Sequence, residues 1–522
     1  MPAQKYVNGC GTPSRGPAQG RARGRMGRVT DAILSPDGIA RLREALTTAG
    51  YTSLGIAERI GPAGTVGMQH NDLRAALRST TGAPDRLATL IRLFVCGQTE
   101  PEQAVAAALA PLPLADAIEA GLVEPVAGGL RAALEIEAYG DQWIVSDVDA
   151  GMRPGQPLPP DHVLGVGGAS TTLAQSTIRR PVGTALDLGT GCGIQALHLS
   201  THAARVTATD LSERALRFAA TTAALNRLDW ELLRGDLTDP VAGRRFDLVV
   251  SNPPFVVGPG TTTHTYRDSG RAGDAVCAEL VAAAPRLLNE GGYLQFLANW
   301  LHVTGEDWAD RVAGWVAGTG LDAWIIQREV SDPVGYVNLW LADASEDPAT
   351  QPARAAAWLD WFDANKIEAV GLGLVTLRAG GHDDPAVRVE DLRQAVDQPL
   401  GAHVEPWFDR QDWLRRQSAD SLLGARLVAA DGLQLRQEAT RGPQGWQVDR
   451  QLLALTEGLR WVEQIDPLVL ALVSACDGTL PLRDQLDVLA AAHQAEPAVL
   501  AEAAVPIVAH LVERGLLLPS EA

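Results

Sequence analysis

The sequence predicts an α/β fold built on a central sheet of mostly parallel strands. Three observations lead to this prediction: short apolar runs alternate with helical patterns from residue 185 onward, the first run breaks into a glycine-rich turn, and a later run ends in Asn-Pro-Pro-Phe. Apolar runs that alternate with helices are typical of sheets whose faces are both covered by helices. We therefore expect both special turns at the tips of strands.

The glycine-rich turn has glycines at Gly189, Gly191 and Gly193, and Asp187 precedes them. Glycine lets the backbone approach a ligand without interference from a Cβ atom, next to the positive end of the helix that follows. A dinucleotide-binding turn would have its third glycine where this chain has Ile194. The spacing therefore indicates a different ligand.

Two acids follow this turn along the chain. Asp210 comes after the strand candidate 206–209, where a carboxylate can accept hydrogen bonds from both hydroxyls of a ribose. Asp210 is alternatively the N-cap of the helix that follows Leu211, and it can do both. Asp236 and Leu237 form a second turn further on.

These residues together resemble the class I S-adenosylmethionine (SAM) methyltransferases, and the resemblance covers residues 160–343, about a third of the chain. It implies SAM as the cofactor and a seven-stranded Rossmann-like core, completed by strands at 293–298, 323–330 and 336–342. It also implies that Asp236 lies near the adenine amine. The cofactor-binding residues that we expect are Asp187, Gly189, Gly191, Gly193, Asp210, Leu211, Asp236, Leu237 and Thr172.

The tetrapeptide Asn252-Pro253-Pro254-Phe255 resembles the signature of methyltransferases that act on planar exocyclic or amide nitrogens. Such an amine is a poor nucleophile because its lone pair is delocalised. The Asn252 side-chain oxygen and the Pro253 carbonyl can each accept one N–H bond from it. The two prolines stiffen the backbone, and Phe255 offers a face on which a flat substrate can stack. We expect these four residues to be catalytic.

Two further segments have two interpretations each. In related methyltransferases the segment before the first strand closes over the methionine part of SAM, so the hydroxyls of Thr171 and Thr172 are candidates to bind its carboxylate. The alternative is a capped helix from Ser170 to Thr177. Tyr266 and Arg267 follow the tetrapeptide closely and either line the substrate site or belong to a solvated loop.

The composition limits the partners. A net charge of −19 weighs against nucleic acid as a partner, since RNA-binding proteins usually present a basic field, although a local patch is compatible with it. The five cysteines form no C-x-x-C pair and the ten histidines no ligand cluster, which predicts a reducing cytoplasm and no metal. No run approaches the about 18 apolar residues of a membrane span, so we expect no membrane partner.

We expect five regions. They are a disordered basic tail at 1–30, a helical, winged-helix-like module at 31–160, the methyltransferase domain at 161–343, a linker and sheet or cleft extension at 344–405, and a second winged-helix-like module at 406–522. The role of the two end modules and the oligomeric state stay open.

The leading functional hypothesis is N-methylation of a guanine or adenine amino group in rRNA or tRNA, because phenylalanine after the two prolines is frequent in ribosomal guanine methylases. Three alternatives stay open: a protein glutamine N5-methyltransferase of the release-factor type, a small-molecule N-methyltransferase, and a binding protein that retains the fold without catalysis. The glutamine methylases usually have tyrosine at the position of Phe255. The acidity of the chain favours a protein or small-molecule substrate.

Overall fold

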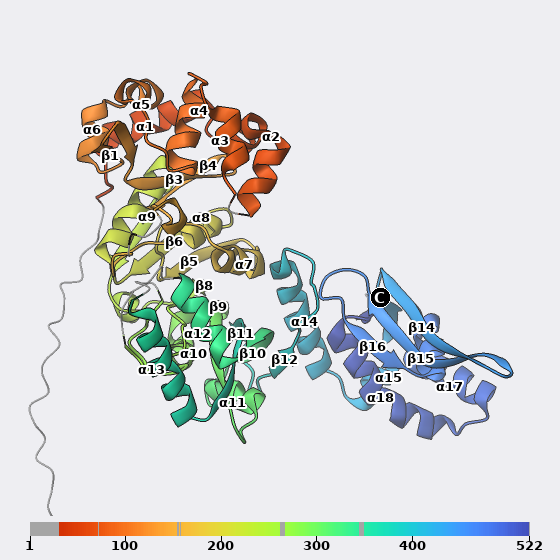
Figure 1. Ribbon diagram of the computed structural model, residues 1–522. Coiled ribbons are helices and arrows are strands. Elements are labelled where there is room, and N and C mark those ends of the chain that lie inside the picture. The colour runs from red at the N-terminus through yellow and green to blue at the C-terminus, as the bar shows by residue number, and fades with distance from the viewer. Residues whose placement is uncertain are drawn as a thin grey trace, which may run out of the picture.

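An eight-stranded sheet runs through the middle of the chain in the order β12-β10-β11-β9-β8-β5-β6-β7 (Figure 1). Its strands are β5 (Val182–Leu188), β6 (Ala203–Asp210), β7 (Trp230–Arg234), β8 (Phe246–Ser251), β9 (Leu288–Val303), β10 (Asp322–Ser331), β11 (Ile367–Arg378) and β12 (Val387–Asp391). All neighbours pair in parallel except β11, which is antiparallel to both β9 and β10. The predicted α/β fold is confirmed.

The structure is a computed structural model that describes residues 31–70, 72–153, 156, 158–261, 267–343 and 349–520. The tail predicted at 1–30 and the candidate Tyr266 lie outside these residues. No helix among the described residues is long and apolar enough to cross a membrane.

Helices cover both faces of the sheet. Residues of α8 (Ile194–Leu199) and α9 (Glu213–Leu225) join one hydrophobic core, and those of α10 (Ala275–Leu287) and α11 (Trp308–Val316) join another. Strand β5 alternates between the two, since Ala185 belongs to the first core and Leu186 to the second. This alternation follows from the period-2 geometry of a strand that is buried on both faces.

The strand predicted at 336–342 is a helix instead, α12 (Pro333–Asp343). Asp332 explains the difference, because its Oδ1 accepts hydrogen bonds from Val334 N and Gly335 N, both at 3.0 Å, and so begins the helix. Helix α13 (Gln351–Ala364) follows. Strands β11 and β12 both come from the segment 344–405, which we expected to extend the sheet or cover the cleft. The core therefore has eight strands and not the predicted seven.

The N-terminal region packs directly on α9. It contains α1 (Pro36–Ala49), α2 (Ser53–Gln69), α3 (Arg74–Thr80), α4 (Arg86–Leu90), a π-helix (Ile91–Val95), α5 (Glu102–Leu109), α6 (Leu114–Glu119), β1 (Val123–Val126), β2 (Gly129–Ala132), β3 (Leu134–Tyr139) and β4 (Gln142–Asp147). Asn226 at the end of α9 accepts a hydrogen bond from Trp143 N at 3.0 Å and donates one to Trp143 O at 2.7 Å. The hairpin β3–β4 is therefore fixed to the central domain.

The C-terminal region lies beyond the β12 edge (Figure 1). It contains α14 (Val404–Arg415), α15 (Ala419–Gly424), β13 (Arg426–Ala429), β14 (Leu433–Gly442), β15 (Gly445–Leu455), β16 (Val462–Ile465), α16 (Pro467–Ala475), β17 (Asp477–Pro481), α17 (Leu482–His493), α18 (Pro497–Arg514) and β18 (Leu517–Pro519). Trp407 of α14 stacks on Trp324 of β10 with ring centroids 4.6 Å apart. Arg388 of β12 pairs with Glu513 of α18 at 2.6 Å.

A buried ion-pair network joins the two regions. Arg378 on β11 binds Asp322 on β10 at 2.7 Å and Asp412 on α14 at 2.5 Å, and Arg415 binds Asp322 at 2.8 Å. Asp322, His382 and Asp412 also bring potential metal-ligand atoms within 4.8 Å of one another. Because two guanidinium groups already contact these carboxylates, we interpret the cluster as an ion-pair network rather than a metal site.

Replacing Asp322 by alanine tests this network. The side chain of Asp322 is 1% exposed, so its removal leaves Arg378 and Arg415 short of a buried counter-charge. We expect Asp322→Ala to lower the free energy of unfolding by about 3–5 kcal/mol in urea titrations followed by circular dichroism. Asp391→Ala, which removes an exposed pair with Arg393, is the control and costs about 0–1 kcal/mol. Equal losses in the two variants would contradict this account.

Candidate functional site

The glycine turn and the tetrapeptide lie side by side at one edge of the sheet. They follow the neighbouring parallel strands β5 and β8, in which Leu188 pairs with Ser251. The Ser251 hydroxyl donates a hydrogen bond to Leu188 O at 2.8 Å and ties the two strand tips together. A Cβ atom added at Gly189 would lie 3.9 Å from the carbonyl oxygen of Asn252. The structure therefore brings the two predicted motifs together.

The glycine turn needs its glycines for conformation. Gly189, Gly191 and Gly193 have φ values of +74°, +55° and +90°, which side chains of L-residues rarely adopt. A Cβ atom at Gly193 would also approach the Trp230 ring to 2.7 Å, whereas one at Gly191 would meet nothing within 4 Å. The backbone at Gly191 is thus open on the side where a ligand can approach.

Asp187 supports this turn from inside the protein. Its Oδ2 accepts hydrogen bonds from the Thr190 hydroxyl at 2.7 Å and from Ala196 N at 3.0 Å. Oδ1 is buried and has no partner among the residues that the structure describes. Burial raises the pKa of this carboxyl to about 7, and the two hydrogen bonds oppose the shift. Asp187 therefore shapes the turn.

Asp210 also holds the turn. Its Oδ2 accepts from Gly191 N at 2.9 Å, its Oδ1 accepts from Ser212 N at 2.8 Å, and burial raises its pKa. The N-cap of α9 is Ser212, whose hydroxyl accepts from Ala215 N, so the N-cap alternative for Asp210 is wrong. Each carboxylate oxygen keeps acceptor capacity for a further donor. The neighbouring Leu211 is 56% exposed and presents an apolar side chain beside it.

The remaining cofactor candidates lie around this edge. Asp236 pairs with Arg271 at 3.3 Å, and Leu237 follows it with a φ of +41°. The segment before the first strand is a helix, α7 (Gly168–Ser176), which begins two residues earlier than the alternative interpretation has it and has no side-chain cap. Thr172 is exposed on this helix. The Gln195 amide donates to Ser170 O at 2.8 Å and holds α7 beside the glycine turn.

The tetrapeptide presents one orphaned acceptor. Asn252 Oδ1 is buried and has no hydrogen-bond partner within the described part of the chain. The Pro253 carbonyl accepts from Phe255 N at 2.7 Å, which leaves it one lone pair. The half-buried Phe255 ring meets Trp340 edge-to-face, with centroids 6.0 Å apart. A buried acceptor without a partner is rare in native proteins and indicates a missing donor.

Two helices, α12 and α13, hold the loop after the tetrapeptide through hydrogen bonds to Val257. Val257 N donates to the Tyr336 hydroxyl at 2.8 Å, and Val257 O accepts from Trp358 Nε1 at 3.0 Å. Asn299 Nδ2 also donates to the Tyr336 hydroxyl at 2.8 Å. Burial raises the pKa of Tyr336, so its hydroxyl stays neutral. Sequence reasoning missed Tyr336, since it lies in the segment predicted as a strand.

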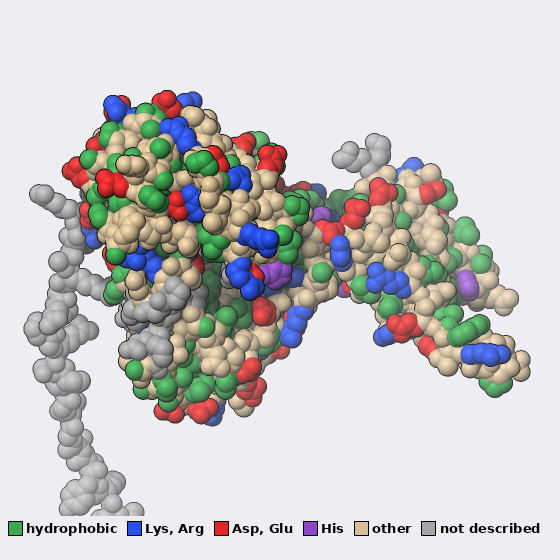
Figure 2. All heavy atoms as spheres, turned by 45° about the horizontal axis from the view of Figure 1, so that its top comes forward, with side chains coloured by type: hydrophobic (Ala, Val, Ile, Leu, Met, Phe, Trp, Pro, Cys, Tyr) green, Lys and Arg blue, Asp and Glu red, His purple; other side chains and the backbone are tan. Residues whose placement is uncertain are grey.

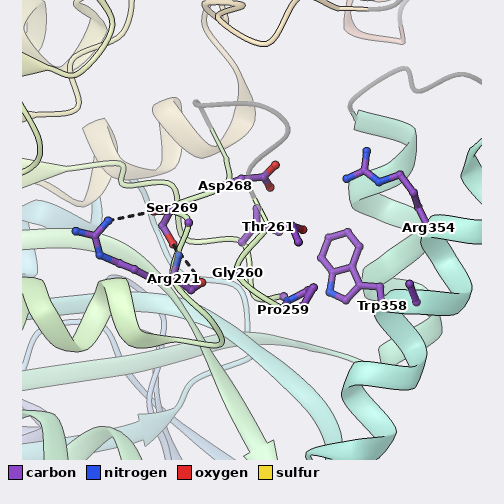
Figure 3. Close-up of a pocket in the computed structure, with 12 residues that line it drawn as sticks. Pro259, Gly260, Thr261, Asp268, Ser269, Arg271, Arg354 and Trp358 are labelled. Carbon is purple, nitrogen blue, oxygen red and sulfur yellow. Dashed lines mark hydrogen bonds between the residues drawn. The ribbon is translucent and has the colours of Figure 1, made fainter. Parts of the chain in front are cut away.

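A pocket of about 330 Å³ opens beside this loop (Figure 3). Its wall includes Val256, residues 258–261 and 268–271, and Trp358. Figure 3 shows Arg354 and Trp358 projecting from α13 toward the loop, while the Arg271 guanidinium points away from α13. Arg267 is buried, at 2% exposed, and its Nη1 donates to Trp340 O at 2.5 Å. Arg267 is therefore not solvated, and a substrate-lining role for it stays a prediction.

Comparison with known families divides the chain into three matched regions. Residues 165–306 match the model described as Methyltransferase small domain. Residues 48–133 and 405–519 match two models that are each described as a domain of unknown function, DUF7059 and DUF7782.

Similar curated proteins share the central region. The chain is 36% identical over 132 residues to ribosomal RNA small subunit methyltransferase C of Haemophilus influenzae (strain PittGG), which is 25% of this chain and 36% of that protein. The protein of the same name from Salmonella arizonae is 30% identical over 166 residues, 31% of this chain and 44% of that protein. The chain thus spans less than half the length of these relatives.

Among solved structures, the chain is similar to a methyltransferase from Pyrococcus furiosus, with 18% identity, a TM-score of 0.26, and coverage of 40% of this chain and 82% of that chain. It is also similar to a SAM-dependent methyltransferase from Thiobacillus denitrificans solved with S-adenosyl-L-homocysteine, with 17% identity, a TM-score of 0.25, and coverage of 41% and 91%. The family match and the curated relatives identify the central domain as a SAM-dependent methyltransferase domain.

The buried carboxyl of Asp187 predicts a pH dependence of stability. Its pKa of about 7 in the folded chain exceeds the unfolded value of about 3.9, so between these pH values the folded state keeps a proton that the unfolded state has lost. The free energy of unfolding therefore falls as pH rises from about 4 to 7. The side chain in Asp187→Asn cannot ionise. We therefore expect the free energy of unfolding of this variant to fall by about 2–4 kcal/mol less than that of the unsubstituted chain over this pH range.

The measurement is a series of urea titrations across this pH range without SAM. The exposed Asp229→Asn serves as the control, since it changes the same charge away from the turn. A pH profile of Asp187→Asn that runs parallel to that of the unsubstituted chain would contradict the assignment.

Proposed function

We propose that the chain is a SAM-dependent methyltransferase that methylates the exocyclic amino group of guanine or adenine in ribosomal RNA. The observation that carries this proposal is the buried, unpartnered Asn252 Oδ1 at the tip of β8. A planar amine has two N–H bonds, and this oxygen is an acceptor that could receive one of them. Asn252 itself lies beside the glycine turn, since its backbone carbonyl oxygen is 3.9 Å from a Cβ atom added at Gly189.

The residues around the glycine turn fit SAM. Gly191 leaves the turn open to a ligand, and Asp210 keeps acceptor capacity for the ribose hydroxyls. The exposed side chain of Leu211 supplies apolar surface for the adenine, and the exposed Thr172 hydroxyl is available for the methionine carboxylate. When bound, SAM supplies an electrophilic methyl group.

The tetrapeptide prepares the acceptor nitrogen. Asn252 Oδ1 and the free lone pair of the Pro253 carbonyl each accept one N–H of the substrate amine, which favours a pyramidal nitrogen and aims its lone pair at the methyl group. SAM would supply the methyl group to this lone pair and keep the electron pair of its own S–C bond on sulfur. The methylated nitrogen then loses one proton to water, so no strong base is required. Phe255 supports the flat base through its ring.

Ribosomal RNA is the substrate class with most support. The relatives in the matched region are named ribosomal RNA small subunit methyltransferase C. The pocket beside the loop is lined from Val256 onward and not by residues 252–255, so it lies next to the tetrapeptide rather than around it. The net charge of −19 is the observation that favours a protein substrate instead.

The test offers radiolabelled SAM to total RNA, ribosomal proteins and release factors in parallel reactions. We expect label in RNA that resists protease and is released by ribonuclease. Asn252→Ala should keep its SAM affinity in calorimetry but lose turnover by about 10²–10³-fold, because this oxygen acts mainly in the transition state. Label in the protein fractions would support the glutamine alternative. Absence of SAM binding to the unsubstituted chain would remove the enzyme proposal.

The hydrogen bond between Val257 N and the Tyr336 hydroxyl predicts a second effect on the turnover number. Tyr336→Phe removes the hydroxyl that receives Val257 N and Asn299 Nδ2 and leaves both donors buried without an acceptor. We expect the turnover number to fall about tenfold as the tetrapeptide loses its fixed position, while SAM affinity stays within about twofold.

The matched control is Tyr139→Phe, which loses one hydrogen bond to His198 in the N-terminal hairpin and should keep its turnover. If Tyr336→Phe lowers thermal stability but leaves the turnover number unchanged, the tyrosine supports the fold and does not position the site.

A further inference from the structure

The hairpin β14–β15 extends from the C-terminal region with both faces uncovered. Almost every residue from Gln434 to Arg441 and from Gly445 to Arg450 is exposed. Figure 1 shows the hairpin running outward from that region, away from the central sheet. A two-stranded ribbon exposed on both faces is marginally stable by itself, so its length indicates a role outside the core.

One face of its outer half carries an aromatic and a basic side chain together. Arg441 pairs with Trp446 and Ala439 with Val448 in the register of the two strands. Because side chains alternate along a strand, these four residues lie on the same face. Trp446 is 73% exposed and Val448 is 49% exposed. The indole is therefore available to a partner.

The charges of the hairpin differ from those of its surroundings. The hairpin has three arginines and two acids, and Arg450 pairs with Glu438 at 2.7 Å. Arg441 forms no ion pair with any residue that the structure describes. From residue 456 to 520, in contrast, the chain has nine acids and three arginines. Figure 2 shows blue and green side chains at the end of the projection on the far right.

We infer that this face of the hairpin binds single-stranded RNA, with a base stacked on Trp446 and a phosphate held by Arg441. The inference rests on the proposed function, because it assigns a second contact to the same RNA substrate. Aromatic side chains that stack with bases and cations that contact the backbone are the usual combination in proteins that bind single strands. Neither contact requires a particular base.

The composition of the face favours RNA over a protein partner. Its aliphatic side chains near the indole are Ala439 and Val448, which offer little apolar area for a protein interface. The exposed Gln437 continues the face toward the core and adds an amide group for polar contacts. A second copy of the chain, docked face to face, would bring two Arg441 side chains together at a cost in repulsion.

The test measures binding of the full-length chain to a fluorescein-labelled oligouridylate of about 12 nucleotides by fluorescence anisotropy. We expect Trp446→Ala to weaken binding about 10- to 100-fold and Trp446→Phe to retain most of it. Arg441→Gln should weaken binding several-fold and reduce the dependence of affinity on salt. Leu54→Ala on α2 and Arg483→Gln on α17 remove exposed side chains elsewhere and should bind as the unsubstituted chain does.

The inference would be overturned if Trp446→Ala bound RNA as tightly as the unsubstituted chain does. It would also be overturned if sedimentation showed that the unsubstituted chain is a dimer and that Trp446→Ala is a monomer. SAM binding and methyl transfer, measured separately, keep the two proposals distinguishable. Methyl transfer to RNA with no effect of Trp446→Ala on binding removes only the hairpin contact. RNA binding that depends on Trp446, without methyl transfer to RNA, removes only the proposed substrate.

Discussion

The parallel pairing of β5 with β8 is the constraint on which the site depends. Both strands are buried, and their tips are joined by the hydrogen bond from the Ser251 hydroxyl to Leu188 O. Neither motif is a site alone, because the glycine turn offers only an open backbone and Asn252 offers only an acceptor. Adjacent parallel strands end at the same edge of a sheet, so the pairing brings two motifs far apart in sequence side by side. The groups are held before any substrate arrives, which is the condition for electrostatic catalysis.

The segment between β10 and β11 gives the site its second support. It forms α12 and α13, which reach back over the loop after the tetrapeptide and hold Val257 through Tyr336 and Trp358. Only then does the chain return to place β11 between β9 and β10. Strand β11 thus joins β9 to β10, and its residues Ile367 and Val370 share a hydrophobic core with residues of both helices. Of the two side chains that hold Val257, Tyr336 lies within the expected domain 161–343, whereas Trp358 lies beyond its expected end.

The sequence could predict the parts of the site that are local. An apolar run comes directly before each of the two motifs, residues 187–193 and 252–255. The adjacent residues therefore suffice to predict that both motifs lie at strand tips. The segment 336–342 was not decidable in this way, because a short apolar run suits a buried helix as well as a strand. The Asp332 cap is a local signal for a helix start, which the prediction of a strand overlooked. Val257, a partner 79 residues away in sequence, adds a tertiary contact that no local pattern contains. The contacts of Asp210 with Gly191 N and of Asp236 with Arg271 are likewise tertiary and leave no sequence spacing to find.

The net charge of the chain is a poor guide to its partner for a physical reason. Charges separated by more than a Debye length, about 8 Å at physiological ionic strength, hardly influence each other in solvent. Arg441 lies eight residues from the start of β14, which at about 3.3 Å per residue is roughly three Debye lengths. A phosphate at the end of the hairpin therefore experiences the local arginine more than the acids of residues 456–520. Those acids repel a polyanion from the other faces, so an acidic body with a locally basic, aromatic projection restricts where RNA can bind rather than preventing it.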